Sequence, residues 1–124
     1  MIGYYPTVHF GTVAAESILI ACIVPKREKG ILVRGMDIFL AVEQAIGPTD
    51  YWVVELGTIE GQMEFFPKAQ KASPFKGLAK GRNEVVFATP VPYATGAVVA
   101  VRATPVGSPA SLADLQVVVR IEEP

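Results

Sequence analysis

The side chains that could do nucleophilic or acid–base chemistry are few in this chain. His9 is the only histidine and Cys22 the only cysteine among 124 residues. A nucleophile–histidine–carboxylate arrangement needs a hydroxyl or thiol and a carboxylate to converge on the histidine. His9 lies in the run TVHFGT and alternates there with Val8 and Phe10, which is typical of a strand residue. We therefore expect no catalytic role for His9.

The sequence favours no metal or cofactor site. One histidine and one cysteine cannot supply the ligands of a structural zinc site, and Glu60 and Glu64 do not match the spacing of a calcium loop. The run GLAKGR lacks the spacing and the Gly-Lys-Ser/Thr ending of a phosphate-binding loop. Carboxylates that pair only in space stay open, because a single sequence does not reveal them. We expect a protein without catalytic residues, metal or cofactor, that is, not an enzyme.

Composition limits the class of protein. The chain is 51% hydrophobic and 19% charged, and its length suits one domain with a buried core. No apolar run approaches the roughly 20 residues that span a bilayer, and the first residues lack a signal-peptide pattern. The net charge of −1 argues against nucleic acid or a membrane as partner. The single asparagine, Asn83, and the 10 prolines are typical of proteins from hot environments.

The elements that would position these residues are predicted to be strands. Apolar residues recur mainly with period two, and turn signals such as PKREKG, IGPTD, GTIEG, TPVPYATG and VGSPAS separate the runs. The run SILIACIV has no polar face, so we expect a central strand covered on both sides. Many short strands without alternating helices predict a single-domain, all-β antiparallel sandwich or barrel. We expect about eight strands, at Thr7–Ala15, Ser17–Val24, Ile31–Val42, Tyr51–Leu56, Gln62–Phe66, Glu84–Ala88, Ala97–Val106 and Leu115–Glu122.

One segment fits two interpretations. Residues 36–46 have apolar side chains at helical spacing, and Gly47 would end such a helix. The same residues alternate as in a strand and continue the alternation that begins at Leu32, which favours the strand. In the resulting sandwich we expect the core to contain Trp52, Leu56, Val99, Val101, Leu115 and Val117.

Two segments carry the candidate interaction residues. Residues 67–82 form a long basic loop without acidic residues, which suits either a solvated loop or an arm that docks on an acidic protein surface. Residues 1–6 form an extended, tyrosine-rich segment, which suits either a cap on the fold or an arm that packs on a neighbouring subunit. The candidate interface residues are Tyr4, Tyr5, Lys68, Lys71, Phe75, Lys76, Lys80 and Arg82.

The order of the segments resembles the jelly-roll module of structural proteins from tailed bacteriophages, including head decoration and tail-associated proteins. The resemblance covers about residues 8–121 and is most specific at the end of the chain. There, a strand ending in Val-Gly-Ser precedes a loop of small residues and an Ala-Asp-Leu-x-Val-x-Val strand. The matching residues are Val106, Gly107, Ser108, Ala113, Asp114, Leu115, Val117 and Val119.

The resemblance implies a jelly-roll β-sandwich and a non-enzymatic role in the virion, after assembly in the host cytoplasm. The expected function is that of a capsid decoration (cement) protein, a homotrimer that binds the major capsid protein or other virion proteins. The alternative is a tail-associated receptor- or carbohydrate-binding module. In that alternative, the stacking platform would be Tyr4, Tyr5, Trp52 and Tyr93. A cupin-like enzyme would need several histidine and carboxylate ligands, which the chain lacks.

Overall fold

The architecture of the chain comes from a computed structural model that describes residues 3–25, 29–44, 50–60, 62–66 and 79–123. These residues form strands, turns and irregular segments, with no helix among them. The nine strands are β1 (Gly3–Tyr4), β2 (Thr7–Val13), β3 (Ser17–Ile23), β4 (Ile31–Leu40), β5 (Tyr51–Glu60), β6 (Gln62–Phe66), β7 (Gly81–Tyr93), β8 (Val98–Val106) and β9 (Leu112–Glu122).

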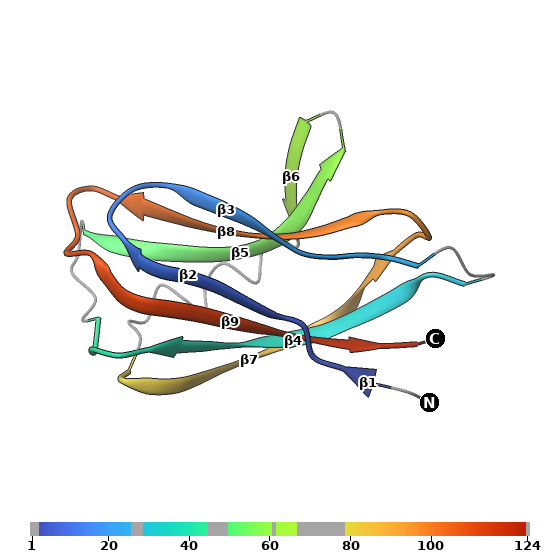
Figure 1. Ribbon diagram of the computed structural model, residues 1–124, viewed down its shortest axis with the longest axis horizontal. Helices are drawn as coiled ribbons and strands as arrows, with labels where there is room; N and C mark the ends of the chain where they lie inside the picture. Colours follow the sequence, from blue (N-terminus) through green and yellow to red (C-terminus); the bar gives the residue numbers. More distant parts are fainter. Residues whose placement is uncertain (1–2, 26–28, 45–49, 61, 67–78, 124) are drawn as a thin grey trace.

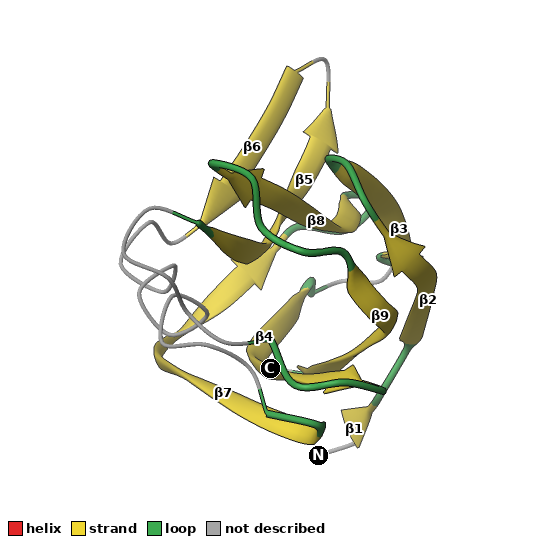
Figure 2. Ribbon diagram, turned by 90° about the vertical axis from the view of Figure 1, so that its left-hand side faces the viewer, coloured by secondary structure: helices red, strands yellow, loops and turns green. Residues whose placement is uncertain are grey.

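The strands form two antiparallel sheets that face each other (Figure 1). Sheet A has the order β1-β9-β4-β7, and β2 pairs with β9 on the same side as β1. Sheet B has the order β3-β8-β5-β6. From β2 to β9, each connection passes from one sheet to the other, except the hairpin between β5 and β6. The end-on view shows the two layers and the tilt of β6 away from sheet A (Figure 2). The prediction of an antiparallel sandwich is confirmed at this level.

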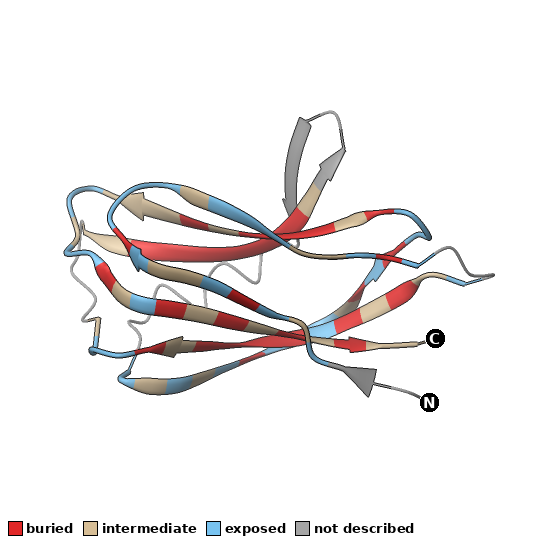
Figure 3. Cartoon of the chain, viewed as in Figure 1, coloured by how far each residue is buried: buried red, intermediate tan, exposed pale blue. Residues whose placement is uncertain are grey.

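The core fills the space between the sheets, and the alternating strands supply it. Along β9, buried residues alternate with partly exposed ones, and the same pattern colours the strands in Figure 3. All six residues expected in the core are at most 2% exposed. Trp52 also ties the core to the loop before β9, because its Nε1 donates a hydrogen bond to the carbonyl of Ala110 at 2.7 Å. The period-two pattern therefore predicted correctly which face of β5, β8 and β9 lies toward the core between the sheets.

The position of β3 differs from the prediction. We expected a central strand covered on both sides, but β3 lies at the edge of sheet B and pairs only with β8 in the described structure. Its apolar side chains are partly or largely exposed, up to 63% at Ile23. The prediction was wrong because an apolar run shows that a strand is suited to burial, not what covers it.

The strands β5 and β7 extend through residues that were expected to form turns. The GTIEG segment continues β5 to Glu60, which pairs with Gln62 across a tight hairpin. The strand β7 begins at Gly81 instead of Glu84 and continues to Tyr93 through Pro90 and Pro92. Proline has no N–H to donate and is tolerated where a strand has a free edge, as β7 has at the end of sheet A.

The segment that fitted both helix and strand is a strand as far as Leu40. Residues 41–44 lie outside β4, and Val42 is 60% exposed. Residues 45 and 46 lie outside the described residues. The strand interpretation is therefore confirmed for Met36–Leu40, where Met36, Ile38 and Leu40 all join the core.

The loop between β8 and β9 is held by a carboxylate from another loop. Ser108 N donates a hydrogen bond to Oδ1 of Asp50 at 2.7 Å. Asp114 has a φ of 51°, a left-handed conformation that aspartate tolerates better than most residues. Gly107 turns the chain with a φ of 73°.

Candidate interaction surfaces

The candidate interface residues from the sequence do not form one cluster in the described part of the chain. Tyr4 lies in β1, where its backbone pairs with Ile121 at the end of β9. Tyr5 follows it and is 61% exposed. Half of the expected arm, residues 3–5, therefore follows sheet A, and the backbone carbonyl of Pro6 accepts a hydrogen bond from Val119 N at 2.9 Å.

The basic loop is described only at its end. Lys80 is exposed, and Arg82 belongs to β7, where its guanidinium lies 2.9 Å from Glu84 and 3.2 Å from Asp37. Lys68, Lys71, Phe75 and Lys76 lie outside the described residues. A docking role for this loop stays a prediction, but Arg82 already has carboxylate partners within its own sheet.

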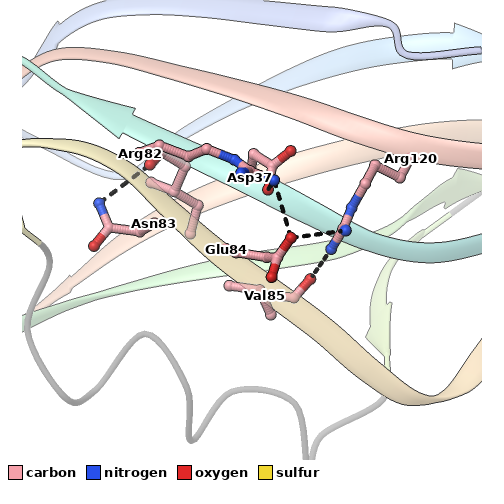
Figure 4. Close-up of polar contacts among 7 residues, drawn as sticks. Asp37, Arg82, Asn83, Glu84, Val85 and Arg120 are labelled. Carbon is pink, nitrogen blue, oxygen red and sulfur yellow. Dashed lines mark hydrogen bonds and ion pairs between the residues drawn. The ribbon is translucent and has the colours of Figure 1, made fainter.

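The outer face of sheet A carries a network of ion pairs among Asp37, Arg82, Glu84 and Arg120 (Figure 4). Strand pairing places Asp37 on β4 beside Glu84 on β7 and Val118 on β9. The guanidinium of Arg120, from β9, reaches Glu84 at 3.3 Å and donates to the carbonyl of Val85 at 2.7 Å. Arg120 therefore crosses β4 and joins the central strand β9 to the edge strand β7.

Gly35 makes this crossing possible. A Cβ at this position would overlap the guanidinium of Arg120 and the backbone carbonyl of Val85. Gly35 pairs with Arg120 on one side and Val86 on the other, so it lies directly beneath the arginine. The bulge in β4 between Val33 and Gly35, in its pairing with β9, sets the register with Arg120. The absence of a side chain, rather than backbone freedom, explains the glycine.

Asn83 fixes the start of β7 to the preceding turn and to β4. Its Nδ2 donates to the carbonyls of Ala79 at 2.9 Å and Ile38 at 3.1 Å, and its Oδ1 accepts from Ala79 N at 2.8 Å. The only asparagine of the sequence therefore has a structural role at the entrance to an edge strand.

The charges on the outer face of sheet A largely neutralise one another. Besides the network in Figure 4, Arg34 forms an ion pair with Glu122 across β4 and β9. In these pairs, the basic residues are Arg34, Arg82 and Arg120, and the acidic ones are Asp37, Glu84 and Glu122. Because each cation has an acidic neighbour, this face offers no strong net charge to a charged partner.

The outer face of sheet B is different near its edge. Arg102 on β8 lies 3.5 Å from the buried Glu55 on β5 and 3.7 Å from Glu16, just before β3. The pairing with β8 places Ile18 beside Arg102 and Ile20 beside Ala100 on this outer face. We call the exposed apolar side chains of this strand the β3 stripe; they are Ile18 (36% exposed), Leu19 (38%), Ile20 (52%) and Ile23 (63%).

The free edge of β3 also carries backbone groups that could bond another strand. Val24 donates to the carbonyl of Ala97 and accepts from Gly96 N, so both of its backbone groups point toward the β8 side. In an antiparallel ladder these directions alternate, so the N–H and C=O of Ile23 point away from β8. No strand in the described residues pairs with this edge.

Sequence reasoning missed the β3 stripe as a surface, although the signal was present. The run from Ile18 to Ile23 contains no charged residue and no proline. Edge strands that stay unpaired usually carry such residues as protection. An apolar run without them points either to a central strand or to an edge that another chain covers.

The aromatic platform expected for the carbohydrate-binding alternative is not available. Trp52 is 2% exposed and Tyr93 is 5% exposed, so neither ring can stack on a sugar. The hydroxyl of Tyr93 donates to the carbonyl of Gly57 at 2.6 Å. Tyr5 is the exposed member of the set, and the side chain of Tyr4 lies outside the described residues. The structure therefore contradicts this platform at two of its four positions.

Burial also shifts the pKa of two neighbouring groups, Cys22 on β3 and Tyr93 at the end of β7. It raises the pKa of the Cys22 thiol, which lies half-buried on β3. Burial, and secondarily the nearby Cys22, raise the pKa of Tyr93 above its ordinary value. A raised pKa keeps a thiol protonated and poorly nucleophilic, and the Cys22 side chain packs partly against the core.

Metal-binding groups, membrane-spanning helices and comparisons with known proteins assign no function to the chain. Among the residues described, no group of three or more histidine, cysteine, aspartate or glutamate side chains could hold a metal ion. That same part of the chain contains no helix that could cross a membrane. We compared the chain with protein-family models, curated proteins and solved structures, and none of them matches it.

Proposed function

We propose that the sandwich is a jelly roll. A jelly roll has eight strands in two sheets, with Greek-key connections between them. The strands β2 to β9 number eight, and they divide into β2-β9-β4-β7 and β3-β8-β5-β6. In this order the first strand lies beside the last, and successive strands pass between the sheets. Strand β1 then extends the first strand along β9.

We further propose that the protein is a non-enzymatic structural protein of a virion, a decoration protein that binds the major capsid protein and stabilises the shell. A protein that binds only the assembled shell stabilises it by mass action. This role needs adhesive surfaces on a rigid scaffold and no reacting group. The resemblance to phage jelly-roll proteins and the strand order both support it.

The observation that carries the proposal is the β3 stripe. Monomeric proteins rarely leave a contiguous apolar patch uncovered unless it serves as an interaction site. The stripe lies on the end strand of sheet B, whereas the outer face of sheet A is occupied by paired charges. A surface of this kind favours a role in assembly over a role as an independent monomer.

The test is binding to shells assembled from the major capsid protein that the same genome encodes. The purified chain should co-sediment with these shells at a saturable stoichiometry and raise the temperature at which they disassemble. Unassembled capsid protein serves as the control, since a decoration protein binds the assembled lattice. Shells before and after expansion are both tested. If the chain neither co-sediments with any shell form nor changes shell stability, the proposal is wrong.

A further inference from the structure

The β3 stripe combines two features that are costly when left uncovered. Its side chains expose apolar surface to water, at roughly 25 cal/mol for each Å². No strand in the described part of the chain pairs with its second edge, which therefore offers backbone donors and acceptors. The sequence of β3 suits a strand with neighbours on both sides. Among the described residues of one copy, it has a neighbour on one side only, which is β8.

We propose that β3 pairs with β3 of a second copy of this chain, antiparallel and about a two-fold axis. The two B sheets would then join into one continuous sheet, in the order β6-β5-β8-β3 followed by β3-β8-β5-β6 of the second copy. In that sheet β3 becomes central, as its apolar sequence requires. Main-chain hydrogen bonds supply affinity in this mode of association, and adjacent side chains supply specificity.

Charge complementarity favours a second copy with this orientation. The exposed Glu16 lies immediately before β3, whereas the segment after it, residues 26–29, has three basic residues and one acidic residue. In an antiparallel pair, the acidic start of each β3 lies toward the end of the other β3, beyond which the described Lys29 is exposed. Parallel pairing would place like charges together, which is destabilising. Lys29, exposed just before β4, belongs to this basic segment.

The chain also sets where the pairing ends. Pro25 follows Val24 and has no N–H, so it cannot donate to a partner strand. The alternation established at Val24 makes Ile23 the last residue that offers both backbone groups to the free edge. A register confined to Ser17–Ile23 keeps the ladder short, and the shared apolar stripe must supply the rest of the stability.

This pairing uses the same β3 stripe that supports the proposed function, and it differs from the trimer that the resemblance implies. A two-fold contact uses the same patch on both copies and is complete with two. The mass of the free protein therefore distinguishes the two assemblies. Failure to bind shells would contradict the decoration role and leave the pairing untouched.

The experiment compares lysine substitutions on the two free edges. Ile23→Lys places a charge on the free edge of β3, and Val86→Lys places the same charge on β7 at an identical exposure of 63%. Multi-angle light scattering and sedimentation equilibrium should give a dimer for the wild type and for Val86→Lys. Ile23→Lys should raise the dimer dissociation constant at least tenfold. Circular dichroism verifies that each variant folds.

A crosslinking experiment keeps the test valid if Ile23→Lys does not fold. Ile20→Cys and Val86→Cys are each made in a Cys22→Ala background and treated with a short bismaleimide at a concentration where wild type associates. Ile20→Cys should give a covalent dimer, and Val86→Cys should stay uncrosslinked. A wild-type monomer or trimer, equal association of both lysine variants, or equal crosslinking at both positions would overturn the proposal.

Discussion

Each sheet ends in a long strand that is paired on one side only among the described residues. These strands, β3 in sheet B and β7 in sheet A, are built in opposite ways. The free edge strand β7 carries Arg82 and Glu84 near its start and Pro90 and Pro92 near its end. The free edge strand β3 carries apolar residues and Ser17. Charges and prolines on an edge are the usual means by which proteins prevent further strands from adding. The edge of β7 therefore carries charges and prolines that oppose pairing, whereas β3 carries neither and has a bulge between Ile20 and Cys22 in its ladder with β8.

The two strands also attach to their sheets by different contacts. Polar side chains fix β7, because Arg120 bonds the carbonyl of Val85 and Asn83 bonds the carbonyl of Ile38. For β3, the attachment is the ladder with β8 and the partial packing of Ala21 and Cys22 on the core. Exposure alone therefore does not define an adhesive edge. The edge must also lack charges and prolines, which on β7 oppose pairing with a further strand.

The largest effect should come from breaking the attachment of β7 at Gly35. In Gly35→Ala, the new Cβ meets the carbonyl of Val85 and the guanidinium of Arg120. The carbonyl cannot move without disturbing the β4–β7 ladder, so we expect a loss of about 2–3 kcal/mol in the free energy of unfolding. Urea unfolding followed by circular dichroism measures this loss, and association of the folded fraction should be unchanged.

Gly96→Ala is the matched control for that substitution. Gly96 has a φ of 82°, and an added Cβ would meet nothing within 4 Å. The control should lose only the cost of left-handed backbone strain, about 1 kcal/mol. Equal losses for the two variants would mean that overlap with Arg120 and Val85 is not what Gly35 avoids, and the account of how β7 is attached would fail.

A smaller and pH-dependent effect is expected at Tyr93, where β7 ends close to Cys22 of β3. Burial and then Cys22 raise the pKa of Tyr93 in the folded protein. The Tyr93 hydroxyl loses its proton at about pH 10 in the unfolded chain, which is the ordinary pKa of tyrosine, whereas the folded protein keeps the proton at this pH. The free energy of unfolding is therefore unaffected by titration of this group below about pH 10 and decreases as the pH rises above that value.

Tyr93→Phe tests this dependence. The variant should lose about 1 kcal/mol at neutral pH, because the hydrogen bond to the Gly57 carbonyl is gone. Its stability should then decline less steeply than the wild type above about pH 10. Urea unfolding across this pH range provides the measurement. Tyr5→Phe, at an exposed tyrosine, should retain the wild-type pH profile; a parallel change in Tyr5→Phe would contradict the assignment.

The sequence predicted most of the fold because alternation records burial directly. The buried faces of β5, β8 and β9 follow from residues such as Trp52, Val99 and Val117, whose side chains point into the space between the sheets. The extent of β7 was missed, because Pro90 and Pro92 indicate a turn until the strand is known to have a free edge. That knowledge requires the order of strands in the sheet.

The candidate surfaces were less predictable for a related reason. The contact between Gly35 and Arg120 joins residues that are far apart in sequence, and no local pattern indicates it. The β3 stripe was visible as an apolar run, but a run of this kind fits either a central strand or an uncovered edge. Its position at the end of sheet B decides between the two.

The smallest effect, and the one that separates the two edges most finely, is expected from removing single exposed carboxylates. Glu16 lies 3.7 Å from Arg102 with its side chain 57% exposed, so Glu16→Gln should change the free energy of unfolding by less than about 0.5 kcal/mol. In the proposed antiparallel β3 pair, the same carboxylate lies toward the end of β3 that the exposed Lys29 follows in the second copy. We therefore expect about two- to threefold weaker association at low salt, and no difference at about 1 M NaCl, where the Debye length is about 3 Å.

Glu84→Gln on β7, with a side chain 49% exposed and contacts to Arg82 and Arg120, is the control and should leave association unchanged. Sedimentation equilibrium at both salt concentrations measures the difference. Identical association of the two variants at low salt would show that charge does not orient the β3 pair.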